Sequence, residues 1–242
     1  MTCTRAVTLP GWCGSETRQM IRLNAMQYLI PNKKRSNRSR VLLLGAHADD
    51  IEIGCGGTIL RLKAEYPKAD FRWIVFSADG QRRQEAIRSA NLFLRGAAGK
   101  SVIVEQYRDG YFPCIGGDIK DYFEQLKRDY SPDIVFTHYR HDLHQDHRVI
   151  CELTWNTFRD HFILEYEVPK YDGDLGAPNF FVALEEKILT KKITNLLSCY
   201  QSQAGKHWFC KELFRSLPRL RGMESTGRHK YAEAFYCRKF TV

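Results

Sequence analysis

The sequence predicts a single α/β domain with a Rossmann-like, mostly parallel sheet and helices on both of its faces. Short, continuously apolar segments, such as VLLL at residues 41–44, are typical of strands that are buried on both faces. Segments with helical spacing alternate with these strands along the chain, which favours parallel pairing. The length of 242 residues, 43% of them hydrophobic, suits one domain of this kind.

The first half of the domain has a regular order of expected elements. Strands are expected at residues 41–44, 71–76, 102–104 and 134–136, where apolar residues follow one another. Helices are expected between them, at residues 57–66, 81–95 and 119–128, because apolar side chains recur there every three or four positions. This alternation of strand and helix predicts an open, doubly wound sheet.

The second half and the N-terminus give weaker patterns. Helical spacing predicts helices at residues 149–162 and 189–200, and residues 180–184 are expected to form a strand. The tail, residues 231–240, is expected to be a last strand or a covering segment. Residues 1–40 have no clear period and end in a basic run, so we expect an N-terminal extension with a basic linker, followed by one domain at residues 41–242.

Composition narrows the classes of function. No apolar run approaches the roughly 20 residues that span a bilayer, and the N-terminus lacks the order of a signal peptide, so a cytoplasmic protein is expected. The eight cysteines include no C-x-x-C pair and are expected to be reduced. Despite the net charge of +9, a nucleic-acid partner is not expected, because no aromatic residues interleave the basic run at residues 33–40. The sequence is compatible with a homo-oligomer.

Two clusters rich in histidine and aspartate follow predicted strands. They are AHADD at residues 46–50 and HYRHDLHQDH at residues 138–147. Ligand sites of open α/β sheets lie at the carboxyl ends of the strands, so the two clusters are expected to meet in space. Imidazoles and carboxylates hold catalytic zinc through three protein groups and leave a position for water, which loses its proton near neutral pH. The pair of clusters therefore predicts a catalytic metal site.

Other interpretations of these residues stay open. His47 alone is compatible with a structural histidine, and Asp49 or Asp50 with the cap of the following helix. Two histidines and one carboxylate also form the facial triad of non-haem iron(II) enzymes, although those enzymes commonly use all-β scaffolds. A third hypothesis is a non-catalytic binding protein that uses its basic termini and keeps the metal for structure. Only three ligands are obvious, which leaves a coordination position open and favours catalysis.

The motifs resemble those of the PIG-L/LmbE-like family of zinc-dependent N-acetylglucosaminyl deacetylases. AHADD, followed by GCGGT at residues 54–58, resembles the first signature of that family, and DLHQDH at residues 142–147 resembles the second. DG at residues 79–80, SPDIV at residues 131–135 and YAEAF at residues 231–235 are similar to further family elements. The resemblance runs from residue 41 to the end. It departs from the family at Ala48, where proline is usual.

The resemblance implies a hydrolase that removes an N-acyl group, typically N-acetyl, from an amino sugar in a small molecule or a glycoconjugate. It also implies that the metal ligands are His47, Asp50 and His147, and that the ion is Zn²⁺, although the same ligands can hold Fe²⁺. Neither the motifs nor the resemblance identifies the molecule that carries the amino sugar.

The resemblance also assigns roles in catalysis. It implies that Asp49 is the general base, that His144 stabilises the oxyanion or protonates the leaving amine, and that Asp146 orients His144. These are the roles that attack of water on an amide requires. Arg82 is a candidate for binding a hydroxyl or carboxylate of the substrate, and a salt bridge to Glu85 is the alternative for this arginine.

Overall fold

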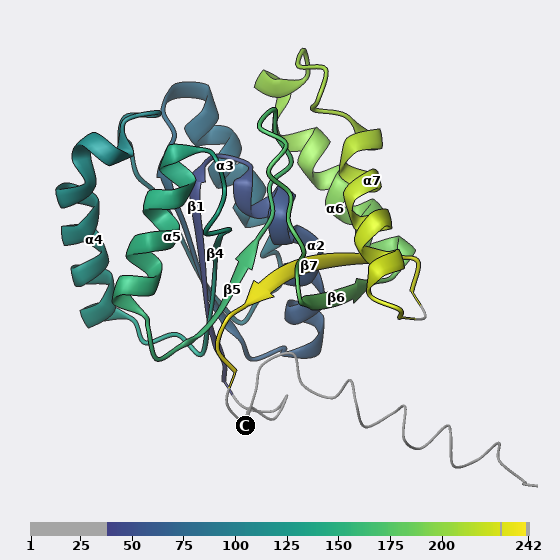
Figure 1. Ribbon diagram of the computed structural model, residues 1–242, viewed down its shortest axis with the longest axis horizontal. Coiled ribbons are helices and arrows are strands. Elements are labelled where there is room, and N and C mark those ends of the chain that lie inside the picture. The colour runs from purple at the N-terminus through teal and green to yellow at the C-terminus, as the bar shows by residue number, and fades with distance from the viewer. Residues whose placement is uncertain (1–37, 228, 241–242) are drawn as a thin grey trace, which may run out of the picture.

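The computed structural model describes residues 38–227 and 229–240, which form one domain around a seven-stranded sheet. The strand order is β3-β2-β1-β4-β5-β7-β6 (Figure 1). The first five strands are parallel, and β7 runs antiparallel to both β5 and β6. The strands are β1 (Arg40–His47), β2 (Asp70–Ser77), β3 (Gly99–Val104), β4 (Ile134–His138), β5 (Phe162–Tyr166), β6 (Phe180–Leu184) and β7 (Tyr231–Cys237). The predicted fold class is therefore confirmed. The expected extension at residues 1–40 lies almost entirely outside the described residues.

Helices cover both faces of the sheet. One face carries α4 (Gly116–Asp129) and α5 (Gln145–Thr157), which lie together at the left of Figure 1. The other face carries α2 (Asp50–Glu65), α3 (Gly80–Phe93), α6 (Glu186–Cys199) and α7 (Lys211–Glu224). Two short 3₁₀ helices, η1 (Phe112–Ile115) and η2 (Gln201–Gln203), lie in connecting segments.

The position of strand β1 between two helical layers explains why its residues are continuously apolar and do not alternate with polar ones. Leu42 and Leu44 pack into the core beneath α4 and α5, whereas Val41 and Leu43 pack into the core on the opposite face. All four side chains are fully buried. A strand between two helical layers has no solvent-facing side, so every position favours an apolar residue.

The second half of the chain corrects two expectations. The predicted helix at residues 149–162 is wrong beyond Thr157, where α5 ends, and the strand β5 begins at Phe162. Residues 158–161 turn towards β5, whose parallel pairing with β4 begins at Phe162, and helical spacing in the sequence cannot report that pairing. Helix α7 was not expected. It contains Pro218. Proline has no amide proton for the hydrogen bond of a helix interior, so this residue disfavours a helix when the sequence is considered alone.

Helix α2 is broken at Cys55, where φ is −141° and ψ is 16°. This break explains why the sequence predicted a helix only from residue 57. Glu233 of β7 accepts hydrogen bonds from the N–H groups of Gly57 (2.8 Å) and Thr58 (2.6 Å) at the start of the second segment. Lys192 of α6 donates to the carbonyl oxygen of Ile53 (2.6 Å) and to Glu233 (2.6 Å). A buried ion pair therefore satisfies backbone groups on both sides of the break.

Other expectations concern the cysteines and the membrane. The described cysteines are unpaired in the structure; they are Cys55, Cys114, Cys151, Cys199, Cys210 and Cys237. None of the helices in the described part of the chain combines the length and the apolar character that crossing a membrane requires.

The ion pair at the break of α2 gives a testable prediction for stability. The side chains of Lys192 and Glu233 are 2% and 3% exposed, so Lys192→Met leaves a buried carboxylate without its cation. We expect the free energy of unfolding to fall by about 3–5 kcal/mol. The control is Lys187→Met, because Lys187 pairs with Glu185 on the surface, where its side chain is 76% exposed. Urea unfolding followed by circular dichroism should show no change for the control. Equal losses in the two variants would contradict the assigned role.

Candidate metal centre

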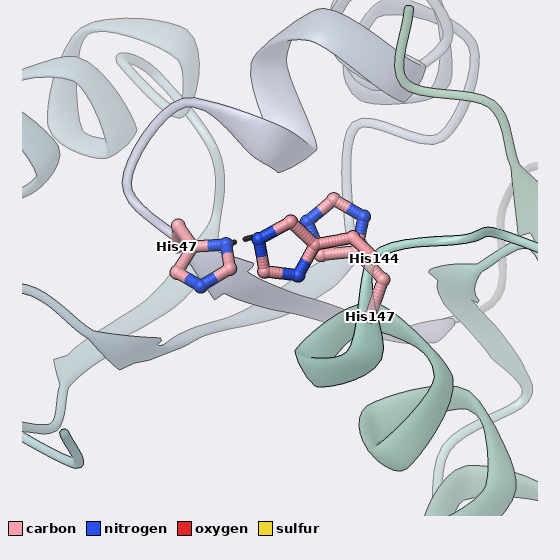
Figure 2. A group of neighbouring side chains, drawn as sticks. All are labelled: His47, His144 and His147. Atoms are coloured by element: carbon pink, nitrogen blue, oxygen red, sulfur yellow. Dashed lines mark hydrogen bonds between the residues drawn. The ribbon is translucent and has the colours of Figure 1, made fainter. Parts of the chain in front are cut away.

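The two histidine-rich clusters meet at the point where the strand order of the sheet reverses. From β1 the chain moves outward through β2 and β3, and it then returns to β4 on the other side of β1. The carboxyl ends of β1 and β4 border a crevice at such a point. His47 ends β1, and His144 and His147 lie at the start of α5 (Figure 2). The predicted meeting is confirmed, because His47 Nδ1 lies 3.3 Å from His147 Nε2.

Three atoms of the predicted ligands form a nearly equilateral triangle. Asp50 Oδ2 lies 3.5 Å from His47 Nδ1 and 3.5 Å from His147 Nε2, and the two nitrogens are 3.3 Å apart. Ligand atoms of a tetrahedral zinc ion, at 2.0–2.2 Å from the metal, lie roughly 3.3–3.6 Å from one another. The residues therefore fit one divalent ion by donor type and by spacing.

His147 is held in the protonation state that a metal ligand needs. Its Nδ1 lies 2.9 Å from Asp142 Oδ2, and because the carboxylate accepts, the imidazole proton is on Nδ1. Burial and the nearby His138 lower the pKa of His147 to about 4, so the ring is neutral at pH 7. The lone pair of Nε2 then faces His47 Nδ1 and Asp50. Such a carboxylate behind a histidine fixes the ring and raises its basicity towards a metal.

His47 has a similar arrangement on the other side of the triangle. Its Nε2 lies 3.1 Å from Asp146 Oδ2 and 3.1 Å from Asp109 Oδ1, which leaves Nδ1 towards Asp50 and His147. Burial alone would lower the pKa of His47, but hydrogen bonds with Asp109, Asp146 and Asp50 raise it well above the ordinary value. The three carboxylates around His47 favour a cation at this position, and a divalent ion can take the place of the proton on the imidazole.

His138 also lies beside the triangle, but its coordinating nitrogen is already occupied. His138 Nε2 lies 3.3 Å from Asp50 Oδ2, and Asp50, His138 and His147 also form a buried group whose spacing suits a metal. However, the N–H of Ala46 donates to this same nitrogen at 2.9 Å. We therefore place His47 rather than His138 in the candidate ligand set.

His144 is positioned as a hydrogen-bond donor. Its Nδ1 accepts a hydrogen bond from the backbone N–H of Asp146 (3.3 Å), which leaves the proton of the neutral ring on Nε2. Burial and the neighbouring His47 lower the pKa of His144, which favours this neutral form. The carboxylate of Asp146 was expected to orient His144, but it accepts from the N–H groups of Gly110 (2.7 Å) and Phe112 (3.1 Å) and lies against His47. The hydrogen bond to the ring of His144 comes from the backbone of Asp146, whereas its carboxylate is hydrogen-bonded to His47, Gly110 and Phe112.

Asp49 precedes α2 in a strained backbone conformation. Its φ of 92° lies in the left-handed region, which residues other than glycine rarely adopt. The carboxylate faces Arg82, whose two terminal nitrogens lie 3.2 and 3.4 Å from its oxygens. Burial raises the pKa of Asp49 to about 6, against the opposing effect of Arg82. Backbone strain of this kind is often retained where it directs a functional side chain.

Arg82 contacts the loop that carries Asp49 and not Glu85. Besides Asp49 it donates to the carbonyl oxygen of Ala48 at 2.5 Å. The alternative salt bridge to Glu85 is absent from the described residues, since Glu85 accepts instead from the N–H of Ser202 at 2.9 Å. Arg82 still lines both cavities beside the site, so a contact with substrate stays a prediction.

Two cavities open beside the candidate ligands. The smaller, of about 490 Å³, is lined by polar groups such as Asp79, Gln106 and Arg108. The larger, of about 620 Å³, extends from His144 and His147 to the β5–β6 loop and the segment before α7. His47, Arg82 and Asp109 line both cavities, so the candidate site lies where the cavities adjoin.

Sequence reasoning assigned no role to two carboxylates that contact the histidines. Asp142 belongs to the second signature, and Asp109 lies outside both histidine-rich clusters. The spacing of Asp142, five residues before His147, offered a weak signal, because the intervening turn brings the two side chains together. The contact between Asp109 and His47 joins separate loops, and only the fold brings them together.

Comparisons with known proteins agree with the fold. Residues 42–158 match the family PIG-L, described as GlcNAc-PI de-N-acetylase. The N,N'-diacetylchitobiose deacetylase of Pyrococcus horikoshii is 20% identical, with a TM-score of 0.57 over 91% of this chain and 92% of that protein. GalB, the 4-carboxy-2-hydroxymuconate hydratase of Pseudomonas putida KT2440, is 18% identical, with a TM-score of 0.63 over 84% and 98%. A zinc-inhibited form of the teicoplanin deacetylase Orf2 is 13% identical, with a TM-score of 0.65 over 82% and 97%.

The carboxylate behind His147 gives a prediction for metal binding. Asp142→Asn removes a negative charge near the candidate ion and weakens the hold on the His147 ring. We expect the affinity for Zn²⁺ to fall about 10- to 100-fold. Competition with a chromophoric chelator measures this affinity, and Asp172→Asn, an exposed position of the β5–β6 loop, is the control. An unchanged affinity in Asp142→Asn would exclude Asp142 from the support of the site.

Proposed function

From the PIG-L family domain that residues 42–158 form, we propose that this protein is a metal-dependent deacetylase that hydrolyses the N-acetyl amide of an amino sugar. The observation that carries the proposal is the triangle of His47, Asp50 and His147, which fits one divalent ion beside a cavity. Zn²⁺ is the proposed ion, and Fe²⁺ suits the same ligands. Such an ion, when bound, supplies a Lewis acid for the amide carbonyl and lowers the pKa of water.

Asp49 is the proposed general base. Its carboxylate is adjacent in sequence to Asp50 and lines the larger cavity together with the candidate ligands. The left-handed conformation at Asp49 lets neighbouring carboxylates point in different directions, one to the ion and one to the attacking water. Arg82 donates hydrogen bonds to both carboxylate oxygens of Asp49 and so holds this side chain in place. Asp49 takes a proton from the water molecule while the water oxygen attacks the carbonyl carbon. It then gives this proton to the amide nitrogen as the carbon–nitrogen bond breaks.

His144 is the proposed oxyanion donor. The proton on its Nε2 is available for a hydrogen bond because Nδ1 is already occupied by the N–H of Asp146. Negative charge develops on the carbonyl oxygen during the attack, and a donor fixed in advance stabilises it without reorganisation. Asp146 supports this arrangement by its backbone, while its carboxylate holds His47.

A hydratase is the second candidate function, because GalB shares the fold. Hydration and amide hydrolysis both need an activated water and a base, so the site alone is compatible with either. The PIG-L match favours the amide, since that family is described as a de-N-acetylase. Release of a primary amine from N-acetylglucosamine and its conjugates, measured with fluorescamine, separates the two reactions.

The role of Asp49 is tested by Asp49→Asn. Asparagine tolerates the left-handed backbone better than alanine does, so this change removes the base with little added strain. We expect kcat for amine release to fall about 10²- to 10⁴-fold, with metal content unchanged. Metal content is measured by atomic absorption on the same preparation. Full activity in Asp49→Asn would eliminate Asp49 as the base.

A further inference from the structure

The hydrogen bonds of Arg82 do not fully fix the orientation of its guanidinium. Its two terminal nitrogens lie 3.2 and 3.4 Å from the oxygens of Asp49, whereas charge-assisted hydrogen bonds are usually about 2.7–2.9 Å long. The contact with the carbonyl oxygen of Ala48 holds one of these nitrogens. The side chain is 26% exposed and lines both cavities, so it has room to turn away from the proposed base. Another group must therefore hold the face of the guanidinium.

The ring of Tyr200 supplies such a contact. Tyr200 follows α6 and lies outside residues 42–158, the part of the chain that matches the family. The central carbon of the Arg82 guanidinium lies 5.5 Å from the centroid of this ring. An aromatic face attracts a cation within about 6 Å, and more strongly when the groups are removed from water. Tyr200 is fully buried, so water screens this attraction only weakly.

Tyr200 is itself held by three other segments of the chain. Its hydroxyl donates to Glu52 in the first turn of α2 at 2.6 Å, and Glu52 is also buried. Its ring packs at 76° to that of Phe209, with the two centroids 6.4 Å apart. Two residues further on, the N–H of Ser202 donates to Glu85 of α3 at 2.9 Å. The ring is therefore a fixed surface against which a flexible side chain can be positioned.

We propose that Tyr200 is a positioning residue, whose ring face holds the guanidinium of Arg82 so that Asp49 stays directed to the attacking water. The inference rests on the proposed function and adds to it a residue that acts through Arg82. Tyr200 is not part of the lining of either cavity, so its effect on the reaction does not come from a contact with substrate. The alternative is a ring that only fills the core, and such a role does not depend on the electrons of the ring.

Variants that keep the shape of the ring test this role in the zinc-loaded full chain. Tyr200→Phe is compared with the same substitution made with 3,5-difluoro- and 3,4,5-trifluorophenylalanine, because fluorine withdraws electrons from the ring face and weakens its attraction for a cation. We expect kcat for amine release from N-acetylglucosamine, or from whichever of its conjugates reacts fastest, to fall stepwise by about tenfold over the series. In Arg82→Met the same series should leave kcat unchanged, because the ring then has no cation to hold.

Tyr130 provides the matched control. Its ring centroid lies 4.2 Å from the guanidinium carbon of Arg72, but its hydroxyl donates to the carbonyl oxygen of Asp70 at the start of β2, at the opposite end of the strand from the candidate site. The same series at Tyr130 should leave kcat within about twofold. A fall there equal to that at Tyr200 would overturn the inference, as would a flat series at Tyr200 or an equal fall in Arg82→Met.

Crystal structures of two variants separate this inference from the proposed function. In Tyr200→Met, which keeps much of the bulk of the side chain without its ring, we expect the guanidinium of Arg82 to leave Asp49. In Tyr200→Phe we expect it to stay. This result in a protein that releases no amine from any compound would refute deacetylation and support the placement of Arg82 by Tyr200. An unmoved Arg82 in both variants would overturn the inference. If Tyr200→Met does not fold, the structure of the trifluorinated variant replaces it, with the same expectation.

Discussion

The need to compensate buried carboxylates shapes much of this structure. A buried charge is costly unless it is paired, and five buried carboxylates pair with lysine or arginine. These pairs are Asp49–Arg82, Asp142–Lys170, Glu165–Arg238, Glu167–Arg221 and Glu233–Lys192. Asp50 and Asp146 differ from these five, because the ion-pair partners found for them among the described residues are imidazoles. The unmatched negative charge lies where a divalent cation fits.

The same pairs position the site. Glu233 and Lys192 hold the break in α2, so the first turn, which carries Asp50, is set apart from the rest of the helix. Lys170 connects the β5–β6 loop to Asp142, which contacts His147 (2.9 Å) and also accepts from the N–H of His144 (2.8 Å). Arg221 ties Glu167, at the start of that loop, to α7. Separate buried charge pairs thus anchor the wall of the larger cavity and the histidines.

The sequence was sufficient for the layers of the fold and for the meeting of its two histidine-rich clusters. Those predictions depended on periodicity and on the rule for strand ends, which are local properties. The sequence predicted no strand at β5, which is fixed by its pairing with β4, and it predicted no helix at α7, where Pro218 disfavours a helix locally. The position of the Asp146 carboxylate was also missed, because its partners Gly110 and Phe112 come from a distant segment. Contacts between segments far apart in sequence depend on the completed fold.

The central claim is that His47, Asp50 and His147 bind one divalent ion. Anomalous diffraction at the zinc edge, on crystals of the zinc-loaded protein, tests it most directly. The account predicts one strong peak at roughly 2.0–2.2 Å from His47 Nδ1, Asp50 and His147 Nε2. A peak coordinated by Asp50, His138 and His147 without His47, or no peak at this end of the sheet, would contradict it.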